Sequence, residues 1–175
     1  MERPILFKGE MVRAILDGVK TQTRRVMKRA FLFGSCISDD TGIINCPFGK
    51  IGDRLWVRET WANALDFGYC TGQYFYRSTY KNGGSFDDVK KWRPSIHMPR
   101  SASRITLEIT DIRVERLHDI TEADALAEGT AYYIEAGKSK NEIMSMRSAF
   151  MDMWQSYYPG IAENSFVWVV GFKKI

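Results

Sequence analysis

The sequence predicts an α+β fold in one domain, and three observations support this prediction. The chain has 175 residues, of which 45% are hydrophobic and 13% aromatic, enough to form one sizeable core. Helical periodicity occurs near the N-terminus and again in the C-terminal third, and β-prone segments occupy much of the rest. We see no internal repeat, low-complexity tract or interdomain linker. We therefore expect strands and helices to share one core.

The first 27 residues predict a strand, a helix and a second strand. Residues 4–7 form the first short strand, and residues 9–17 form a helix that ends near Gly18, a residue suited to a left-handed C-cap. The helix has one apolar face, made by Met11, Val12, Ile15 and Leu16. The second strand covers residues 21–27.

The middle of the chain predicts further strands separated by irregular segments. Alternating or β-prone sequence marks residues 54–61, 74–80 and 103–117, and the last strand is long enough to bend. Residues 31–50 mix turn formers with short apolar runs, which predicts a hairpin or an irregular insertion. Residues 81–91 predict an exposed, mobile loop.

Two capping boxes organise the C-terminal third. A Thr-x-x-Asp box at Thr121 begins a short helix over residues 122–128, which Gly129 ends. A Ser-x-x-Glu box at Ser139 begins a longer helix that stops at Pro159. The longer helix carries an apolar stripe, formed by Ile143, Met146, Phe150, Trp154 and Tyr157. We interpret this stripe as core packing rather than as a base-stacking surface.

Composition favours a polyanionic partner and argues against a membrane span. Lys and Arg outnumber Asp and Glu by 25 to 21, which gives a formal net charge of +4. No apolar run approaches the roughly 20 residues that a membrane span needs. The N-terminus also lacks a signal-peptide pattern, so we expect a cytoplasmic location.

The three cysteines, Cys36, Cys46 and Cys70, predict free thiols. Their spacings match neither a zinc ligand pair nor a disulfide framework. A zinc site completed by His97 or His118 is the alternative, but structural zinc usually draws at least one closely spaced ligand pair. We expect no metal and no cofactor.

The segment from Gly18 to Arg25 is the strongest candidate for a reactive site. Lys20 and Thr23 can act as base and nucleophile if burial or the cations Arg24 and Arg25 lower the pKa of the lysine. Residues three apart point to opposite faces of a regular strand, so this pair converges only across a bend. The alternative is a solvated, positively charged strand edge.

Glu59 lies on the apolar face of its predicted strand, together with Leu55 and Val57. A buried carboxylate needs a cation, and Lys20 or Arg25 is the expected partner. Glu59 therefore serves either as an architectural ion-pair partner or as part of the site. Arg58, on the opposite face of the strand, competes for a place in the site.

Residues 92–104 predict a rigid, cationic loop because two prolines in this segment forbid a regular helix. Arg93, Arg100 and Arg104 suit phosphate contacts, and Trp92 provides a stacking surface. The alternative is a loop anchored by buried side chains, which is compatible with exposed arginines. We expect His97 to be structural.

The residues Gly18, Lys20, Thr23 and Arg25 match the signature G-x-K-x-x-[E/T]-x-R of the ASCH (activating-signal-cointegrator homology) domain. Other elements follow in the order that this family uses, namely Gly52-Asp53, residues 56–61, Ala127-Glu128-Gly129 and an aromatic closing strand over residues 166–172. The chain resembles the family over nearly its whole length, and most resembles the longer branch encoded by tailed phages and prophages, in which a segment like residues 92–99 is typical.

This resemblance implies a small, mixed, mainly antiparallel β-barrel of the PUA-like (pseudouridine synthase and archaeosine transglycosylase) kind, flanked by helices. It also implies a single ASCH domain over residues 1–175, with insertions at about 30–50 and 69–100.

The resemblance also implies a chemistry. One bacterial branch of the family hydrolyses N4-acetylcytidine, with a lysine as proton acceptor, a threonine as nucleophile and a glutamate as proton donor. These roles fall on Lys20, Thr23 and Glu128, and Arg25 is placed to steady the oxyanion. The implied substrate is an N4-acylated cytidine or a related modified nucleobase.

The main alternative is an RNA-binding module or a ribonuclease, because ASCH and PUA-like domains also serve in those roles. Single-stranded RNA is then the partner. Its phosphates would contact Arg24, Arg25, Arg58, Arg93, Arg100 and Arg104, and its bases would stack on Trp56 and Trp92. A third reading is an accessory protein that binds another protein.

Overall fold

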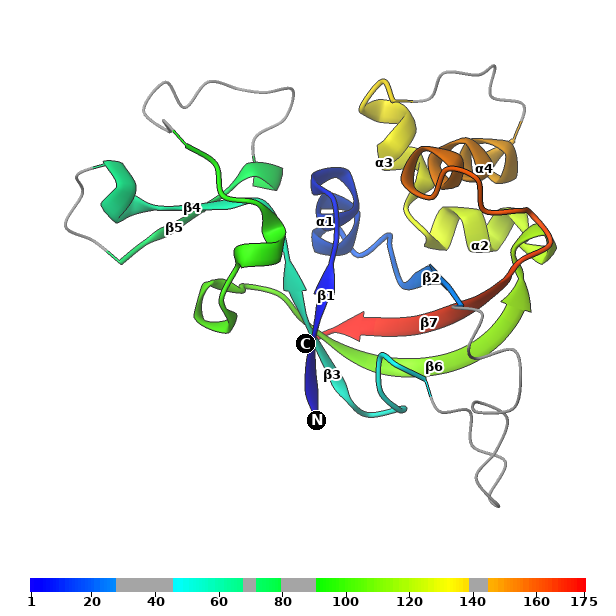
Figure 1. The fold of residues 1–175 in the computed structure, drawn as a ribbon, viewed down its shortest axis with the longest axis horizontal. Helices are drawn as coiled ribbons and strands as arrows, with labels where there is room; N and C mark the ends of the chain where they lie inside the picture. The colour runs from blue at the N-terminus through cyan, green and yellow to red at the C-terminus, as the bar shows by residue number, and fades with distance from the viewer. Residues whose placement is uncertain (28–45, 68–71, 80–90, 139–144) are drawn as a thin grey trace.

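The computed structural model describes residues 1–27, 46–67, 72–79, 91–138 and 145–175. Helices lie on one side of a five-stranded sheet, and a two-stranded sheet projects from it as an arm (Figure 1). The larger sheet contains β1 (Glu2–Leu6), β2 (Gln22–Val26), β3 (Arg54–Arg58), β6 (Thr106–Arg116) and β7 (Phe166–Lys174). The arm contains β4 (Trp61–Asn63) and β5 (Tyr74–Tyr76). The helices are α1 (Gly9–Leu16), α2 (Glu122–Ala127), α3 (Thr130–Glu135) and α4 (Met146–Tyr157).

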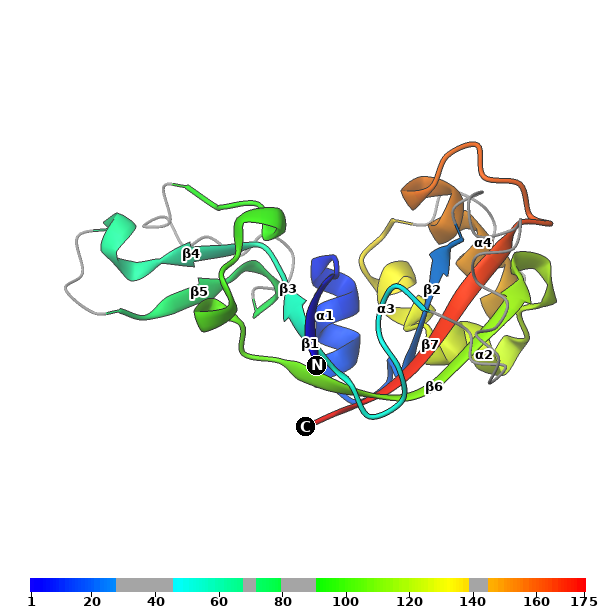
Figure 2. The same cartoon turned by 60° about the horizontal axis from the view of Figure 1, so that its bottom comes forward.

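The larger sheet is mixed and mainly antiparallel, as predicted. Its strand order is β1-β3-β6-β7-β2, and only the β1–β3 pair among these neighbours is parallel. The predicted barrel is wrong, because β1 and β2 are the outer strands and no ladder joins them in the described part of the chain. Both views place α1 between these strands, in the space where a closing ladder would lie (Figure 1, Figure 2).

The prediction of one strand over residues 54–61 is also wrong. β3 ends at Arg58, and the chain enters the arm at Trp61. A continuous strand would aim the Glu59 carboxylate at the apolar core that lies beneath β3. The break instead lets Glu59 pair with Arg104 at 2.9 Å, which satisfies a charge that the core cannot.

Other predicted elements are confirmed to within a few residues. Gly18 follows α1 with φ +75°, as a left-handed C-cap requires. β6 changes register between Ile109 and Asp111, a bulge that agrees with the predicted bend. β5 is shorter than the predicted strand over residues 74–80, because a 3₁₀ turn begins directly after Tyr76.

The C-terminal third contains one more helix than the sequence predicts. The capping box between Thr121 and Asp124 is confirmed at the start of α2. α3 was not predicted; it begins directly after Gly129, with no separate capping box to mark it. α4 begins with its own box at Ser145, whereas the box predicted at Ser139 lies outside the described residues.

An apolar core joins the larger sheet to the helices. Phe150 and Trp154 of α4 belong to it, which confirms the packing role predicted for that stripe. Cys46 is buried there and forms no disulfide with a described residue, and Cys36 and Cys70 lie outside the described residues. Parts of the irregular segments predicted over residues 31–50 and 81–91 also lie outside them. None of the described helices has the length and apolar character to span a membrane.

Gly129 joins α2 to α3 at the point where both pack against the start of the chain. Its φ is +80°, and a Cβ placed on it would lie 2.9 Å from Ala14 Cβ and 3.3 Å from Lys20 Cβ. The turn therefore presses on α1 and on Lys20, and both its backbone conformation and its close approach require glycine.

We predict that Gly129→Ala lowers the free energy of unfolding by about 2–4 kcal/mol, because left-handed strain and overpacking add. Gly18→Ala is the matched control, since its φ is +75° but nothing lies within 4 Å of the added Cβ. It should cost only about 1 kcal/mol. Urea unfolding of both variants measures the difference, and equal losses would show that the close approach has no energetic consequence.

Candidate functional site

A cavity of about 290 Å³ lies between the start of α1, the edge strand β2 and α4. Lys20, Thr23 and Glu128 all line it, although they come from the turn before β2, from β2 itself and from the C-cap of α2. The fold thus brings together the three residues for which the family resemblance implies catalytic roles. Each of them is at most 4% exposed. The alternative of a solvated strand edge is therefore wrong for Lys20 and Thr23.

Lys20 and Glu128 form a buried ion pair. The Lys20 Nζ lies 2.9 Å from Glu128 Oε2, and it also donates to the main-chain oxygens of Glu128 at 2.7 Å and Gln22 at 2.8 Å. All three ammonium N–H groups are thereby used. Burial lowers the pKa of Lys20, the Glu128 carboxylate raises it, and the charges of Arg25 and Arg24 lower it further.

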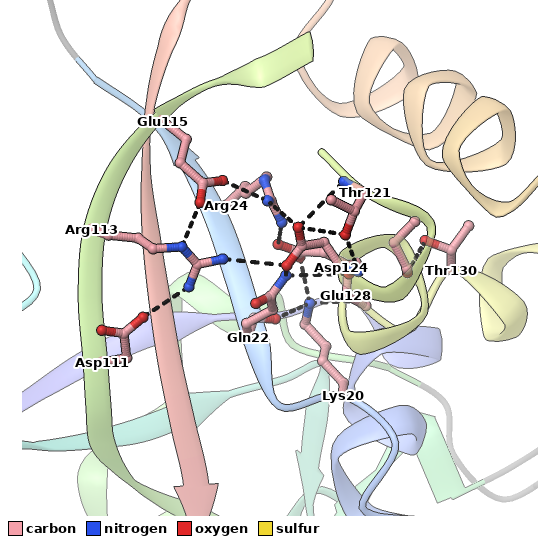
Figure 3. A network of polar contacts seen from close by, with 11 residues as sticks. Lys20, Gln22, Arg24, Asp111, Arg113, Glu115, Thr121, Asp124, Glu128 and Thr130 are labelled. Carbon is pink, nitrogen blue, oxygen red and sulfur yellow. Dashed lines mark hydrogen bonds and ion pairs between the residues drawn. The ribbon is translucent and has the colours of Figure 1, made fainter. Parts of the chain in front are cut away.

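Arg24 holds Glu128 from its other oxygen (Figure 3). Its guanidinium, which has no exposed surface, lies 3.3 Å from Glu128 Oε1, 2.8 Å from Glu115 Oε2 and 3.3 Å from Asp124 Oδ2. Arg113 pairs with the same Glu115 and Asp124, which extends the network to the surface. Arg24 therefore orients a carboxylate, and its three ion pairs compete with the phosphate contact predicted for it.

Thr23 also lines the cavity. It pairs with Val170 in the β2–β7 ladder. Within the described part of the chain its hydroxyl makes no hydrogen bond, and it does not bond to Lys20. Lys20 and Thr23 do line the same cavity, as the expected bend requires, although they are not hydrogen-bonded to each other. The Thr23 hydroxyl is thus free to contact a ligand.

The opposite wall of the cavity is largely apolar and aromatic. It consists of Phe150, Met153, Trp154, Tyr157 and Tyr158 of α4 and the residue after it. The helical spacing of Phe150, Trp154 and Tyr157 predicts packing alone, yet these side chains contribute both to the core and to the cavity wall. Sequence reasoning missed Lys8 and Tyr158, which line the cavity but belong to no motif, and it gave no role to Ser95, which lies in the segment of residues 92–99 and also lines the cavity.

Arg25 connects the two edges of the open sheet. Its Nη2 donates to the main-chain oxygen of Leu6 at 2.7 Å, and its Nη1 donates to the Tyr158 hydroxyl at 3.3 Å. The guanidinium lies 5.1 Å from the ring centre of Phe7. No carboxylate pairs with Arg25 among the described residues, and its buried Nε has no partner there. It therefore keeps N–H donors for an anion.

Glu59 belongs to a second polar cluster, outside the cavity. It is 1% exposed and pairs with Arg104 and with the Ser78 hydroxyl. The expected pairing of Glu59 with Lys20 or Arg25 is wrong, because the break after β3 turns this carboxylate toward the arm.

The other predicted binding residues do not line the cavity. Their charges and rings are engaged elsewhere: Arg58 donates to Met98 and covers Trp56, Arg93 covers Trp61, Trp92 faces Arg77, and Arg100 pairs with Glu2. Most of these contacts are arginine–aromatic pairs on or near the arm. These residues therefore form no RNA-binding surface continuous with the cavity unless their present contacts are broken.

Comparisons with known proteins identify only distant likenesses. No family model matches the chain, and no curated protein sequence matches it. Four solved chains match in structure. An ASCH domain from Lactobacillus crispatus JV V101 is 14% identical, with a TM-score of 0.39, over 94% of this chain and 69% of that one. A DUF984 protein from Enterococcus faecalis V583 is 11% identical, with a TM-score of 0.40, over 93% and 65% of the two chains. Hypothetical protein PH0355 is 11% identical, with a TM-score of 0.42, over the whole of both chains. Identities and TM-scores this low carry no argument about function, so the chemistry of the site has to be argued from its own geometry.

We predict that Glu59→Gln lowers the free energy of unfolding by about 2 kcal/mol, because it leaves Arg104 facing a neutral amide in a buried position. Glu2→Gln is the control, since the Glu2–Arg100 pair is exposed and should contribute little. Thermal melts compare the two. A Glu59→Gln melting temperature equal to wild type would mean that the buried charge has no structural role.

We also predict that the free energy of unfolding falls in acid as the Asp124 carboxylate becomes protonated. Burial raises the pKa of this carboxyl, but hydrogen bonds from Gln22 and Thr121 and the charge of Arg24 lower it to about 2. Its stabilisation is therefore complete above its ordinary pKa of about 4 and is lost as the pH falls toward 2. Asp124→Asn should cost about 1–2 kcal/mol at pH 6 and progressively less down to pH 2. Urea unfolding across this range measures it, and a cost that does not change with pH would contradict it.

Proposed function

We propose that this protein hydrolyses the amide of an N4-acylated cytidine or a related modified nucleobase, with Thr23 as the nucleophile. One observation carries the proposal: a buried Lys20–Glu128 pair lines the same cavity as Thr23, whose hydroxyl makes no hydrogen bond to any described residue. A nucleophile, a potential base and a potential acid in one cavity are what acyl transfer requires. Membership of the ASCH family, in its longer phage-encoded branch, is part of the same proposal and rests on the sequence motif.

The ion pair supplies both the base and the acid. Transfer of one proton from Lys20 to Glu128, across 2.9 Å, gives a neutral amine and a neutral carboxylic acid. Burial favours this neutral pair relative to its stability in water, and the nearby cations Arg24 and Arg25 act against the charged lysine. One proton transfer thus prepares Lys20 as proton acceptor and Glu128 as proton donor.

Acylation then follows in two steps. The Lys20 amine takes the Thr23 hydroxyl proton as the Thr23 oxygen attacks the acyl carbonyl, and unspent N–H donors of Arg25 stabilise the resulting oxyanion. The C–N bond breaks as Glu128 gives its proton to the departing N4 amine, which leaves cytidine and an acyl ester on Thr23. Lys20 has to exchange one of its carbonyl acceptors for the Thr23 hydroxyl, because the two are not hydrogen-bonded in this arrangement.

Hydrolysis of the ester restores the site. Water attacks the ester carbonyl while the Glu128 carboxylate accepts its proton, and Thr23 leaves with a proton from the Lys20 ammonium. The carboxylic acid product departs, and transfer of a proton from Glu128 to Lys20 regenerates the ion pair. No step requires a metal or a redox cofactor.

The cavity suits a base and its sugar better than a larger ligand. Its volume of about 290 Å³ lies just below the range of about 300–1,000 Å³ typical of ligand pockets. Phe150 and Trp154 provide an apolar wall for a planar ring.

RNA binding without chemistry is the alternative, and the geometry supports it less. Two of its proposed phosphate contacts, Arg100 and Arg104, pair with carboxylates, and an arginine already covers Trp56. Single-stranded RNA therefore has to displace existing contacts before it can use them.

We predict that the protein releases cytidine from N4-acetylcytidine, followed as a change in ultraviolet absorbance. Thr23→Ala should lower kcat by at least about 10³-fold, and Glu128→Gln and Lys20→Met should each be severe, with losses that do not add in double variants. Thr21→Ala is the matched control, because Thr21 is an exposed threonine two residues away whose contacts are main-chain. It should keep wild-type activity.

Thermal melts of each variant separate loss of chemistry from loss of fold, which matters most for Lys20→Met because it leaves Glu128 short of a partner. The proposal fails if folded wild-type protein hydrolyses no N4-acylated cytosine derivative over a panel of acyl groups. Retained, salt-dependent RNA binding in that case would favour the binding module.

A further inference from the structure

Lys8 is a cation on the cavity that the reaction does not use. It follows β1 and lines the cavity, and its Nζ lies 3.7 Å from the ring centre of Tyr157. Its side chain has no hydrogen bond or ion pair within the described residues. A cation–π contact orients an ammonium group without neutralising it, so the charge of Lys8 remains available to an anion.

Among the described residues, the carboxylate that acts on Lys8 is that of Glu10, and it is already balanced. Glu10 forms an ion pair with Lys138 at 2.8 Å and accepts a hydrogen bond from the Tyr157 hydroxyl at 2.7 Å. Burial and the Glu10 charge raise the pKa of Tyr157, so its hydroxyl stays protonated and keeps donating to Glu10. Glu10 therefore fixes the Tyr157 ring beneath Lys8 and does not cancel the Lys8 charge.

The remaining charges of the cavity leave a positive excess. Its lining contains four cations, Lys8, Lys20, Arg24 and Arg25, and one carboxylate, Glu128. Lys20 and Arg24 hold that carboxylate, and Arg24 also pairs with Glu115 and Asp124 behind the wall. Arg25 and Lys8 stay outside this network, and a neutral nucleoside brings no counter-charge to either of them.

The cavity has a buried end and an end that is open to solvent. Lys20, Thr23 and Glu128 are at most 4% exposed and mark its closed end, whereas Lys8 is exposed and Ile96, on the facing 3₁₀ turn, is 56% exposed. A nucleoside that brings its N4-acyl group to Thr23 points its ribose toward the open end. A phosphate on that ribose then comes to the side of the cavity where Lys8 lies.

We propose that Lys8 binds the phosphate of a nucleotide, so that the substrate is a nucleoside monophosphate rather than a free nucleoside. This inference rests on the proposed function for the orientation of the base. The Ser95 hydroxyl, which lines the same cavity and makes no hydrogen bond within the described residues, is available as a second donor to the phosphate. Lys8 binds and positions the ligand and takes no part in bond making.

The test measures binding of non-reactive probes by calorimetry: cytidine, cytidine 5′-monophosphate, cytidine 3′-monophosphate and ribose 5-phosphate. At least one cytidine monophosphate should bind about tenfold or more tightly than cytidine, the magnitude of one charge-assisted hydrogen bond. Lys8→Gln should remove this preference and Lys8→Arg should keep it. Lys50→Gln, an exposed lysine that does not line the cavity, should leave it unchanged. Added salt should narrow the preference without weakening cytidine binding.

The two proposals fail in different ways. Monophosphates that bind within threefold of cytidine, or a preference that survives in folded Lys8→Gln, would overturn the phosphate site even if N4-acetylcytidine is hydrolysed. Lys8-dependent binding of ribose 5-phosphate without any binding of cytidine would support the phosphate site and would remove the nucleobase from the proposed function. Absence of binding by all four probes would overturn both.

Discussion

The buried contact between Lys20, Glu128 and Arg24 is the constraint on which the rest of the site depends. Three charged groups with almost no exposed surface are tolerable only because each carboxylate oxygen meets a cation and the ammonium meets three acceptors. Removal of any one member leaves a buried charge with too few partners. The surrounding structure therefore has to hold all three in place, whatever reaction or ligand they serve.

Packing around Gly129 provides that support. The turn between α2 and α3 approaches α1 and Lys20 so closely that a single added methyl group would collide with Ala14 and crowd Lys20. The Lys20 main chain is itself fixed by hydrogen bonds from the N–H groups of Val19 and Lys20 to the Ala14 oxygen. The backbone of α1 thus sets one partner of the ion pair, and the end of α2 sets the other. Residues 108 positions apart in sequence are brought to 2.9 Å by the contact of two helix ends.

Short sequence motifs predicted the helix ends correctly, because contacts between residues close in sequence determine them. The capping box at Thr121 and the glycine stop at Gly18 specify helix ends through bonds between near neighbours, and both are confirmed. The partner of Glu59 was not predictable in this way, because Arg104 lies 45 positions away and reaches it only after β3 breaks. Motif matching found Lys20, Thr23 and Glu128, but no pattern marks Lys8, whose place on the cavity depends on where α4 packs.

The open sheet explains why the cavity lies where it does. A closed barrel would pair the backbone of β1 with that of β2, and the space that Leu6, Thr23 and Arg25 now line would be filled by a ladder. Here a side chain spans the two edges instead, through the 2.7 Å bond from Arg25 to the Leu6 oxygen. That bond satisfies one edge carbonyl while it leaves room for a ligand beside Thr23. Exposed edge strands promote aggregation in many proteins, but here residues of β1 and β2 line the candidate site.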